Sequence, residues 1–101
     1  MPAAESNVLI SSFTMPREIA DLVRQLRQQL GLSQEKLAAK LGVSFRTVNR
    51  WENGHTLPSA LALKQVEELL HQMSHSSKAT VRDCGKNLLS HYFQERGRDG
   101  E

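Results

Sequence analysis

The sequence is poor in cysteine and in aromatic residues. Its single cysteine, Cys84, excludes an intramolecular disulfide and fits a reducing compartment, so we expect a cytoplasmic protein. Aromatic residues make up 5% of the 101 residues, so a core must be built mainly from leucine, valine, isoleucine and alanine. No run approaches the roughly 18 apolar residues of a membrane span. The first residues also lack the basic region and apolar run of a secretory signal.

An excess of charge of one sign is missing as well. The 13 lysines and arginines nearly balance 11 acidic residues, the net charge is +2, and no segment is polybasic. A nonspecific electrostatic arm for nucleic acid is therefore not predicted. The chain also lacks a nucleophile elbow and a phosphate-cradling glycine loop, so we expect a protein that is not an enzyme and needs no cofactor.

The sequence does contain helical periodicity over residues 16–73, with clear signals for where each helix begins and ends. Thr14 is a candidate N-cap, Pro16 fits the first turn of a helix, and Gly31 supplies a left-handed stop. Three more helices are predicted to begin after serine N-caps, at Ser33, Ser44 and Ser59. No long alternation of period two is present, so the expected fold is all-α: a compact bundle of four to five short helices.

The apolar positions of these helices recur at helical spacing. In the helix after Ser59, the predicted stripe is Leu61, Val66, Leu69, Leu70 and Met73. Residues 1–15 are expected to form a flexible arm, and residues 96–101 a disordered tail. Residues 74–95 predict a fifth helix, whose apolar stripe is Val81, Cys84, Leu88, Leu89, Tyr92 and Phe93.

The most informative stretch is residues 30–54, LGLSQEKLAAKLGVSFRTVNRWENG. Two capped helices meet there at a turn too short for antiparallel packing, and the glycine in that turn allows a sharp reversal. Ala38 is small enough for a close crossing of the helices, and the expected shared core is made of Leu37, Leu41, Val43, Val48 and Trp51.

The opposite face of the second of these helices is then left exposed, with Phe45, Arg46, Asn49 and Arg50. These side-chain types read base edges: arginine pairs with guanine, asparagine with adenine, and an apolar group contacts the thymine methyl. The pattern therefore indicates a helix that reads DNA in the major groove.

The same stretch resembles the helix-turn-helix of the Cro and phage-repressor type, also called the xenobiotic-response-element family, over about residues 17–73. The matching residues are Leu32-Ser33-Gln34, Leu37-Ala38, Leu41-Gly42-Val43-Ser44, Val48, Trp51-Glu52-Asn53-Gly54 and Pro58. The resemblance implies a lambda-repressor-like bundle and a sequence-specific, DNA-binding transcriptional regulator.

The resemblance also implies roles for single residues. The positions expected to face the bases are Ser44, Phe45, Arg46, Asn49 and Arg50. Those expected at the DNA backbone are Gln34, Thr47 and Asn53, and Arg27 with Glu52 is expected to form a structural ion pair. Phe45 departs from the family, where polar residues are common; it either contacts a thymine methyl or packs inward.

On this interpretation the protein is a homodimer that reads a two-fold operator with residues 45–53 in the major groove. The stripe in residues 79–93 has three interpretations: packing on the domain, a dimer contact or a partner-binding segment, of which the dimer contact is favoured. The alternative function is an antitoxin that binds a toxin through Val81, Leu88 and Tyr92. The chain could also be the DNA-binding piece of a longer protein.

Two further patterns carry weak signals. Glu67, His71 and His75 share one helix face, but this set lacks a recognisable further ligand, so no metal site is predicted. Cys84 lies on an apolar stripe, which favours a buried filler over a redox sensor.

Overall fold

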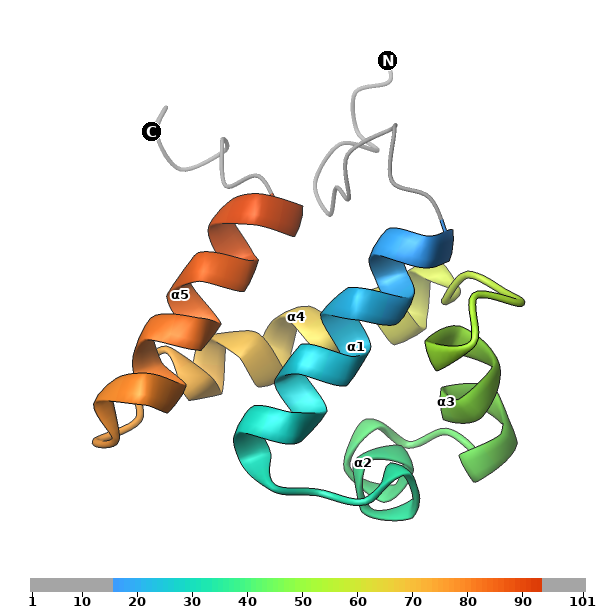
Figure 1. Cartoon of the computed structure of the whole chain (residues 1–101), viewed down its shortest axis with the longest axis horizontal. Helices are drawn as coiled ribbons and strands as arrows, with labels where there is room; N and C mark the ends of the chain where they lie inside the picture. Colours follow the sequence, from blue (N-terminus) through green and yellow to red (C-terminus); the bar gives the residue numbers. More distant parts are fainter. Residues whose placement is uncertain (1–15, 94–101) are drawn as a thin grey trace.

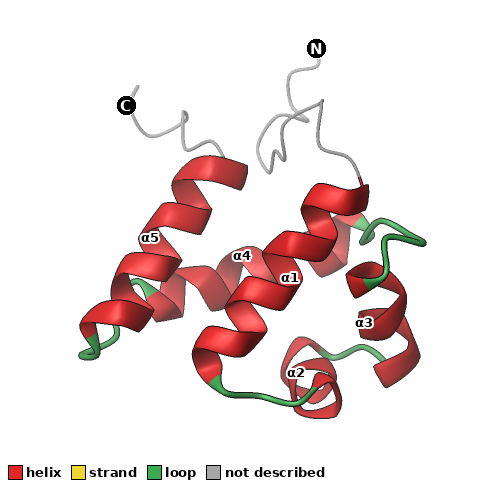
Figure 2. Ribbon diagram, viewed as in Figure 1, coloured by secondary structure: helices red, strands yellow, loops and turns green. Residues whose placement is uncertain are grey.

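The computed structural model describes residues 16–93, and its regular structure is helical throughout (Figures 1 and 2). The helices are α1 (Pro16–Leu30), α2 (Gln34–Leu41), α3 (Phe45–Glu52), α4 (Ala60–Met73) and α5 (Ala79–Tyr92). The all-α prediction is confirmed. The predicted arm of residues 1–15, with its Thr14 cap, and the predicted tail of residues 96–101 lie outside the described residues.

Local signals begin and end the helices where they were predicted. The hydroxyl oxygens of Ser33, Ser44 and Ser59 each accept a hydrogen bond from the N–H three residues further on, at 3.0 or 3.1 Å. Gly42 ends α2 with a φ of 76°, a left-handed conformation that glycine adopts without steric cost. This turn redirects the chain sharply into α3, which ends at Glu52, one residue before the predicted end.

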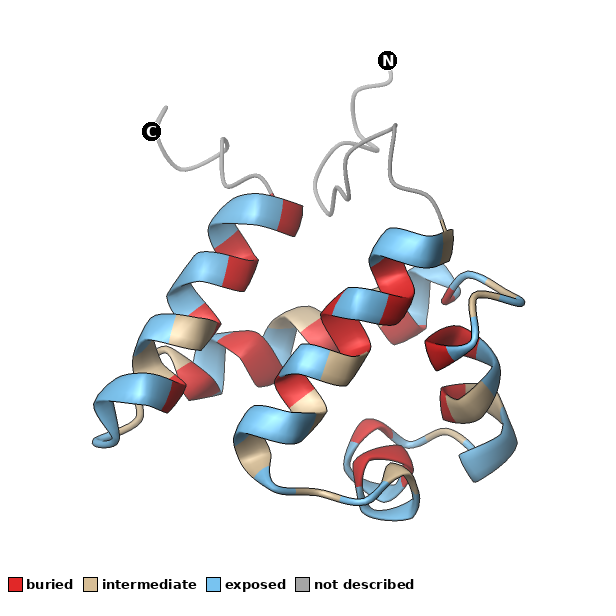
Figure 3. Ribbon diagram, in the orientation of Figure 1, coloured by how far each residue is buried: buried red, intermediate tan, exposed pale blue. Residues whose placement is uncertain are grey.

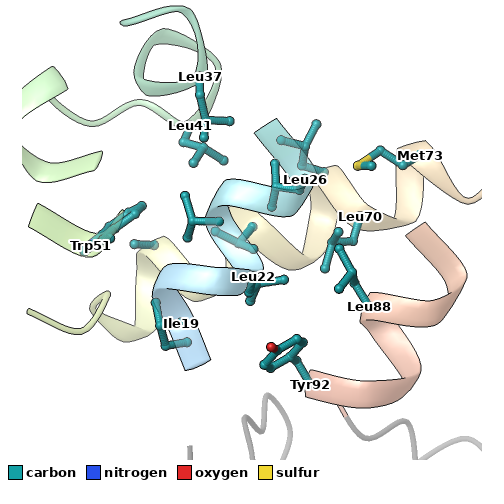
Figure 4. Close-up of a cluster of buried hydrophobic side chains, with 14 of the residues drawn as sticks. Ile19, Leu22, Leu26, Leu37, Leu41, Trp51, Leu70, Met73, Leu88 and Tyr92 are labelled. Carbon is teal, nitrogen blue, oxygen red and sulfur yellow. The ribbon is translucent and has the colours of Figure 1, made fainter. Parts of the chain in front are cut away.

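The core is organised around α1. In Figure 1, α1 crosses in front of α4, with α2 and α3 on one side and α5 on the other. Each helix buries one stripe of residues, as Figure 3 shows. The buried residues of α1, including Leu22 and Leu26, meet Leu37 of α2, Trp51 of α3 and Leu70 of α4 in one hydrophobic cluster (Figure 4). Full burial of a single leucine side chain contributes about 1.5–3 kcal/mol, so this cluster dominates the stability.

One predicted core position was wrong. Leu61 is 70% exposed, whereas its neighbour Ala62 is 6% exposed. The buried stripe of α4 runs from Ala62 through Val66 to Met73. Leu61 lies one position, or about 100° of helix rotation, away from that stripe. The position of a residue around the helix axis therefore determines its burial here, and the size of its side chain does not.

The apolar stripe of α5 is buried within the chain itself, against α1 and α4. Leu88 and Tyr92 point toward Leu22 and Leu70 in Figure 4 and belong to the same cluster. Gly85 lies where α5 approaches α4 most closely: a Cβ at this position would be 2.7 Å from the backbone nitrogen of Ser74. The fifth helix thus packs on the domain, the first of the three interpretations.

Burial also bears on the chemistry of Cys84. The side chain is half-buried, and desolvation raises the pKa of its thiol. At a given pH the thiolate fraction is then lower, so we expect alkylation by iodoacetamide to be slower than that of a free cysteine peptide at about pH 8.5. Mass spectrometry over a series of pH values measures this rate. A rate equal to that of the peptide would contradict the filler interpretation and favour a redox sensor.

Candidate nucleic-acid interface

Helix α3 presents two different sides. Val48 and Trp51 are buried in the core, whereas Phe45, Arg46 and Arg50 are exposed to solvent. Phe45 is 48% exposed, so of its two expected placements the structure shows the outward one. The exposed side of α3 therefore combines a large apolar group with two guanidinium groups.

An ion pair between α1 and α3 fixes the position of α3. The Nε of Arg27 lies 2.6 Å from Oε2 of Glu52, and Nη2 lies 3.0 Å from Oε1, which makes the contact bidentate. Glu52 is 4% exposed, so its charge is removed from water and depends on this partner. The hydrogen bond with Glu52 raises the pKa of Arg27, although burial opposes it, and the guanidinium stays charged.

A second arginine of α1 contacts the same end of α3. Nη2 of Arg24 donates a hydrogen bond of 2.6 Å to the backbone oxygen of Glu52. The last carbonyl groups of a helix lack partners within the helix, and a cation there also offsets the negative end of the helix dipole. This contact was not predicted from the sequence. Its signal is the spacing of Arg24 and Arg27, which at i, i+3 lie on one face of α1.

Side-chain amides extend this contact from the core to the exposed side of α3. Nε2 of Gln34 donates to Oε1 of Glu52 at 3.0 Å, and Nδ2 of Asn49 donates to Oε1 of Gln34 at 3.2 Å. Nδ2 of Asn53 then donates to Oδ1 of Asn49 at 3.1 Å. Gln34, at the start of α2, thus braces α3, and the carboxamide of Asn49 is held from two directions.

The remaining polar residues at the start of α3 are also engaged. Oγ of Ser44 accepts the N–H of Thr47 at 3.0 Å and lies 2.9 Å from the Thr47 hydroxyl. Ser44 therefore serves as the N-cap of α3, and its hydroxyl is already paired. Thr47 is half-buried beside it.

A separate set of polar residues, for which no metal site was predicted, includes Glu67 and His71. The exposed His71 lies 3.8 Å from the half-buried Glu67 on α4. Within residues 16–93, no three His, Cys, Asp or Glu side chains come together in a way that could hold a metal ion. In the same range, none of the helices has the length and apolar character that crossing a membrane requires.

The sharp turn between two short capped helices, with the second helix exposed on one side, defines a helix-turn-helix domain. A family model described as "Helix-turn-helix" matches residues 23–75, and the chain belongs to this family. This match confirms the resemblance noted from residues 17–73.

Several proteins share the segment. An uncharacterised HTH-type transcriptional regulator of Methanothermobacter thermautotrophicus is 37% identical over 49 residues, which cover 48% of this chain and 71% of that protein. Another, from Sinorhizobium medicae, is 32% identical over 53 residues, covering 52% of this chain and 38% of that protein. The type II methyltransferase M1.ScrFI of Lactococcus lactis subsp. cremoris is 38% identical over 52 residues, covering 48% of this chain and 13% of that enzyme. The methyltransferase similarity therefore covers the helix-turn-helix segment, and the chain spans well under two thirds of the last two relatives.

Proposed function

We propose that this protein is a sequence-specific, DNA-binding transcriptional regulator that places α3 in the major groove. The main observation behind the proposal is that α3 has one buried side and one exposed side. Its apolar side packs in the core, and its other side exposes Phe45, Arg46 and Arg50. An α-helix fits the major groove, and its first turns reach deepest. Membership of the helix-turn-helix family supports the same function.

The residues around α3 suit contacts with the DNA backbone. Gln34 lies at the start of α2, and Asn53 follows the last residue of α3, so both flank the exposed side. Such polar side chains bind phosphate oxygens and fix the orientation of a protein on the duplex, without reading sequence. We assign this role to Gln34, Thr47 and Asn53.

The proposal includes a homodimer on a two-fold operator. The described part of the chain measures 37 × 33 × 21 Å. Half-sites one helical turn apart are about 34 Å from centre to centre, so two copies bound side by side come into contact. Because the apolar stripe of α5 is buried, a contact through residues 79–93 would use its polar outer side. The exposed side chains of Leu57 and Leu61 offer apolar area to a second copy.

Binding-site selection from a random DNA pool tests the proposal. We expect a palindrome with half-sites one turn apart, bound at least about 10³ times more tightly than random DNA. The salt dependence of the selected site would then give the number of phosphate contacts. Weak, salt-sensitive binding without an enriched sequence would contradict the proposal.

The residues through which an antitoxin was expected to bind its toxin are not exposed. Its docking residues, Val81, Leu88 and Tyr92, are all buried against α1 and α4. A toxin could reach them only by displacing α5, which would break the hydrophobic cluster. No observation in the described residues favours this alternative over the regulator.

A further inference from the structure

We infer that a hollow between α1 and the end of α3 binds one phosphate of the DNA backbone in each half-site, with Arg17 as the main contact. The hollow has a volume of about 280 Å³ and is lined by Arg17, Ala20, Asp21, Arg24, Asn53 and Gly54. This inference rests on the proposed function, because it requires α3 to lie in the major groove. The sequence alone predicts a structural ion pair for α1, through Arg27, and no contact with DNA.

The hollow lies beside the exposed side of α3. Asn53 directly follows Glu52, the last residue of α3, and its exposed side chain donates to Oδ1 of Asn49 at 3.1 Å. The first turns of a helix in the major groove reach deepest, so its last residue lies nearer the edge of the groove. The phosphates run along that edge. The hollow therefore faces the strand of backbone that borders the groove.

The two arginines of the hollow have N–H donors to spare. Arg17 is exposed in the first turn of α1 and makes no hydrogen bond or ion pair with any residue between 16 and 93. Arg24 is held in place, with Nη2 at 2.6 Å from the backbone oxygen of Glu52 and Nη1 at 3.6 Å from Oδ1 of Asp21. These contacts use at most two of the five N–H groups of a guanidinium, so Arg24 also keeps donors for a further acceptor.

The charge of the hollow matches a single phosphodiester group. Among the described residues that line it, Asp21 is acidic and is already paired with Arg24. The charge of Arg17 is then left over, and each phosphate of DNA carries one negative charge. Guanidinium groups bind phosphate oxygens through charge-assisted hydrogen bonds, often two at a time. Apart from Ala20 and Gly54, the described lining is polar or charged, so the hollow does not suit an apolar ligand.

Arg17→Ala tests the inference on the selected operator. Because Arg17 is exposed and unpaired within residues 16–93, we expect the fold to stay intact, which thermal unfolding checks. At about 0.1 M salt the affinity should fall about 10-fold per half-site, and the plot of log affinity against log salt should become less steep by about 0.9 per half-site. The loss should be the same for the operator and for its single-base variants, because a phosphate contact does not read sequence.

Lys78→Ala is the matched control, because it also removes one exposed positive charge. Lys78 precedes α5 in the α4–α5 loop, which lies on the opposite side of α1 from α3 (Figure 1). Its affinity and salt slope should equal those of the wild type. Ethylation of single phosphates removes their charge and locates the contact: one position per half-site should weaken the wild type and leave Arg17→Ala unaffected.

The outcomes separate this inference from the proposed function. If wild-type protein enriches no sequence, the proposed function fails. If the wild type binds a selected operator but Arg17→Ala behaves as Lys78→Ala does, only the inference is overturned. A change in preference at one base pair in Arg17→Ala would also overturn it, because Arg17 would then contact a base edge and not a phosphate.

Discussion

Replacing Arg27 with alanine is expected to lower the free energy of unfolding by about 3–5 kcal/mol. The side chain itself is partly exposed, but its removal leaves Glu52, which is 4% exposed, as a buried charge with only Gln34 as a side-chain donor. The cost comes mainly from this unpaired carboxylate and only in small part from the lost attraction. Urea denaturation followed by circular dichroism measures the change.

Two variants check this explanation. Arg24→Ala removes a contact with a backbone oxygen and leaves the Arg27–Glu52 pair intact, so it should cost much less. Adding Glu52→Leu to Arg27→Ala removes the unpaired charge and should recover a large part of the lost stability. A double variant no more stable than Arg27→Ala would show that the burial of charge is not the cause.

Gly85→Ala is expected to destabilise the protein by about 3 kcal/mol, at the upper end of the range for overpacking. Helix propensity alone predicts the opposite sign, since alanine is favoured over glycine by about 1 kcal/mol within a helix. At this position a Cβ would lie 2.7 Å from the Ser74 nitrogen and 2.8 Å from the Leu70 oxygen. Both are backbone atoms of the α4 segment, which cannot move aside as a side chain would, so α5 must shift away from α4.

Asn87→Ala is the matched control, because residue 87 lies on the same helix but is exposed. It should change the free energy of unfolding by no more than about 0.5 kcal/mol. Thermal unfolding of both variants makes the comparison. If Gly85→Ala raised the melting temperature, the close approach of α5 to α4 would be contradicted.

Much of the fold could be predicted because its signals are local. Each serine cap at Ser33, Ser44 and Ser59 bonds a backbone N–H three residues away, and Gly42 acts within its own turn. Such contacts depend on neighbouring residues alone, so they can be predicted from a short stretch of sequence. The helix-turn-helix followed from these signals and from the apolar spacing of α2 and α3.

The parts that could not be predicted depend on how helices cross. Leu61 looked like a core residue by size, but the angle at which α4 meets the core selects Ala62 instead. The contact of Arg24 with the end of α3 joins residues 28 apart in the chain. The spacing of Arg24 and Arg27 places both on one face of α1, but it does not indicate which helix that face meets. The hydrogen bond between Asn49 and Gln34 likewise forms only when α2 and α3 pack together.

The burial of α5 also bears on where this domain can be cut or joined. The segment that the family model matches ends at residue 75, yet the hydrophobic cluster continues through Leu88 and Tyr92 to Phe93. A fragment that stops at residue 75 would expose apolar surface of α1 and α4 to water and would be prone to aggregate. For this chain, the boundary given by sequence similarity divides a hydrophobic core. Fusions and domain exchanges should therefore be joined after residue 93.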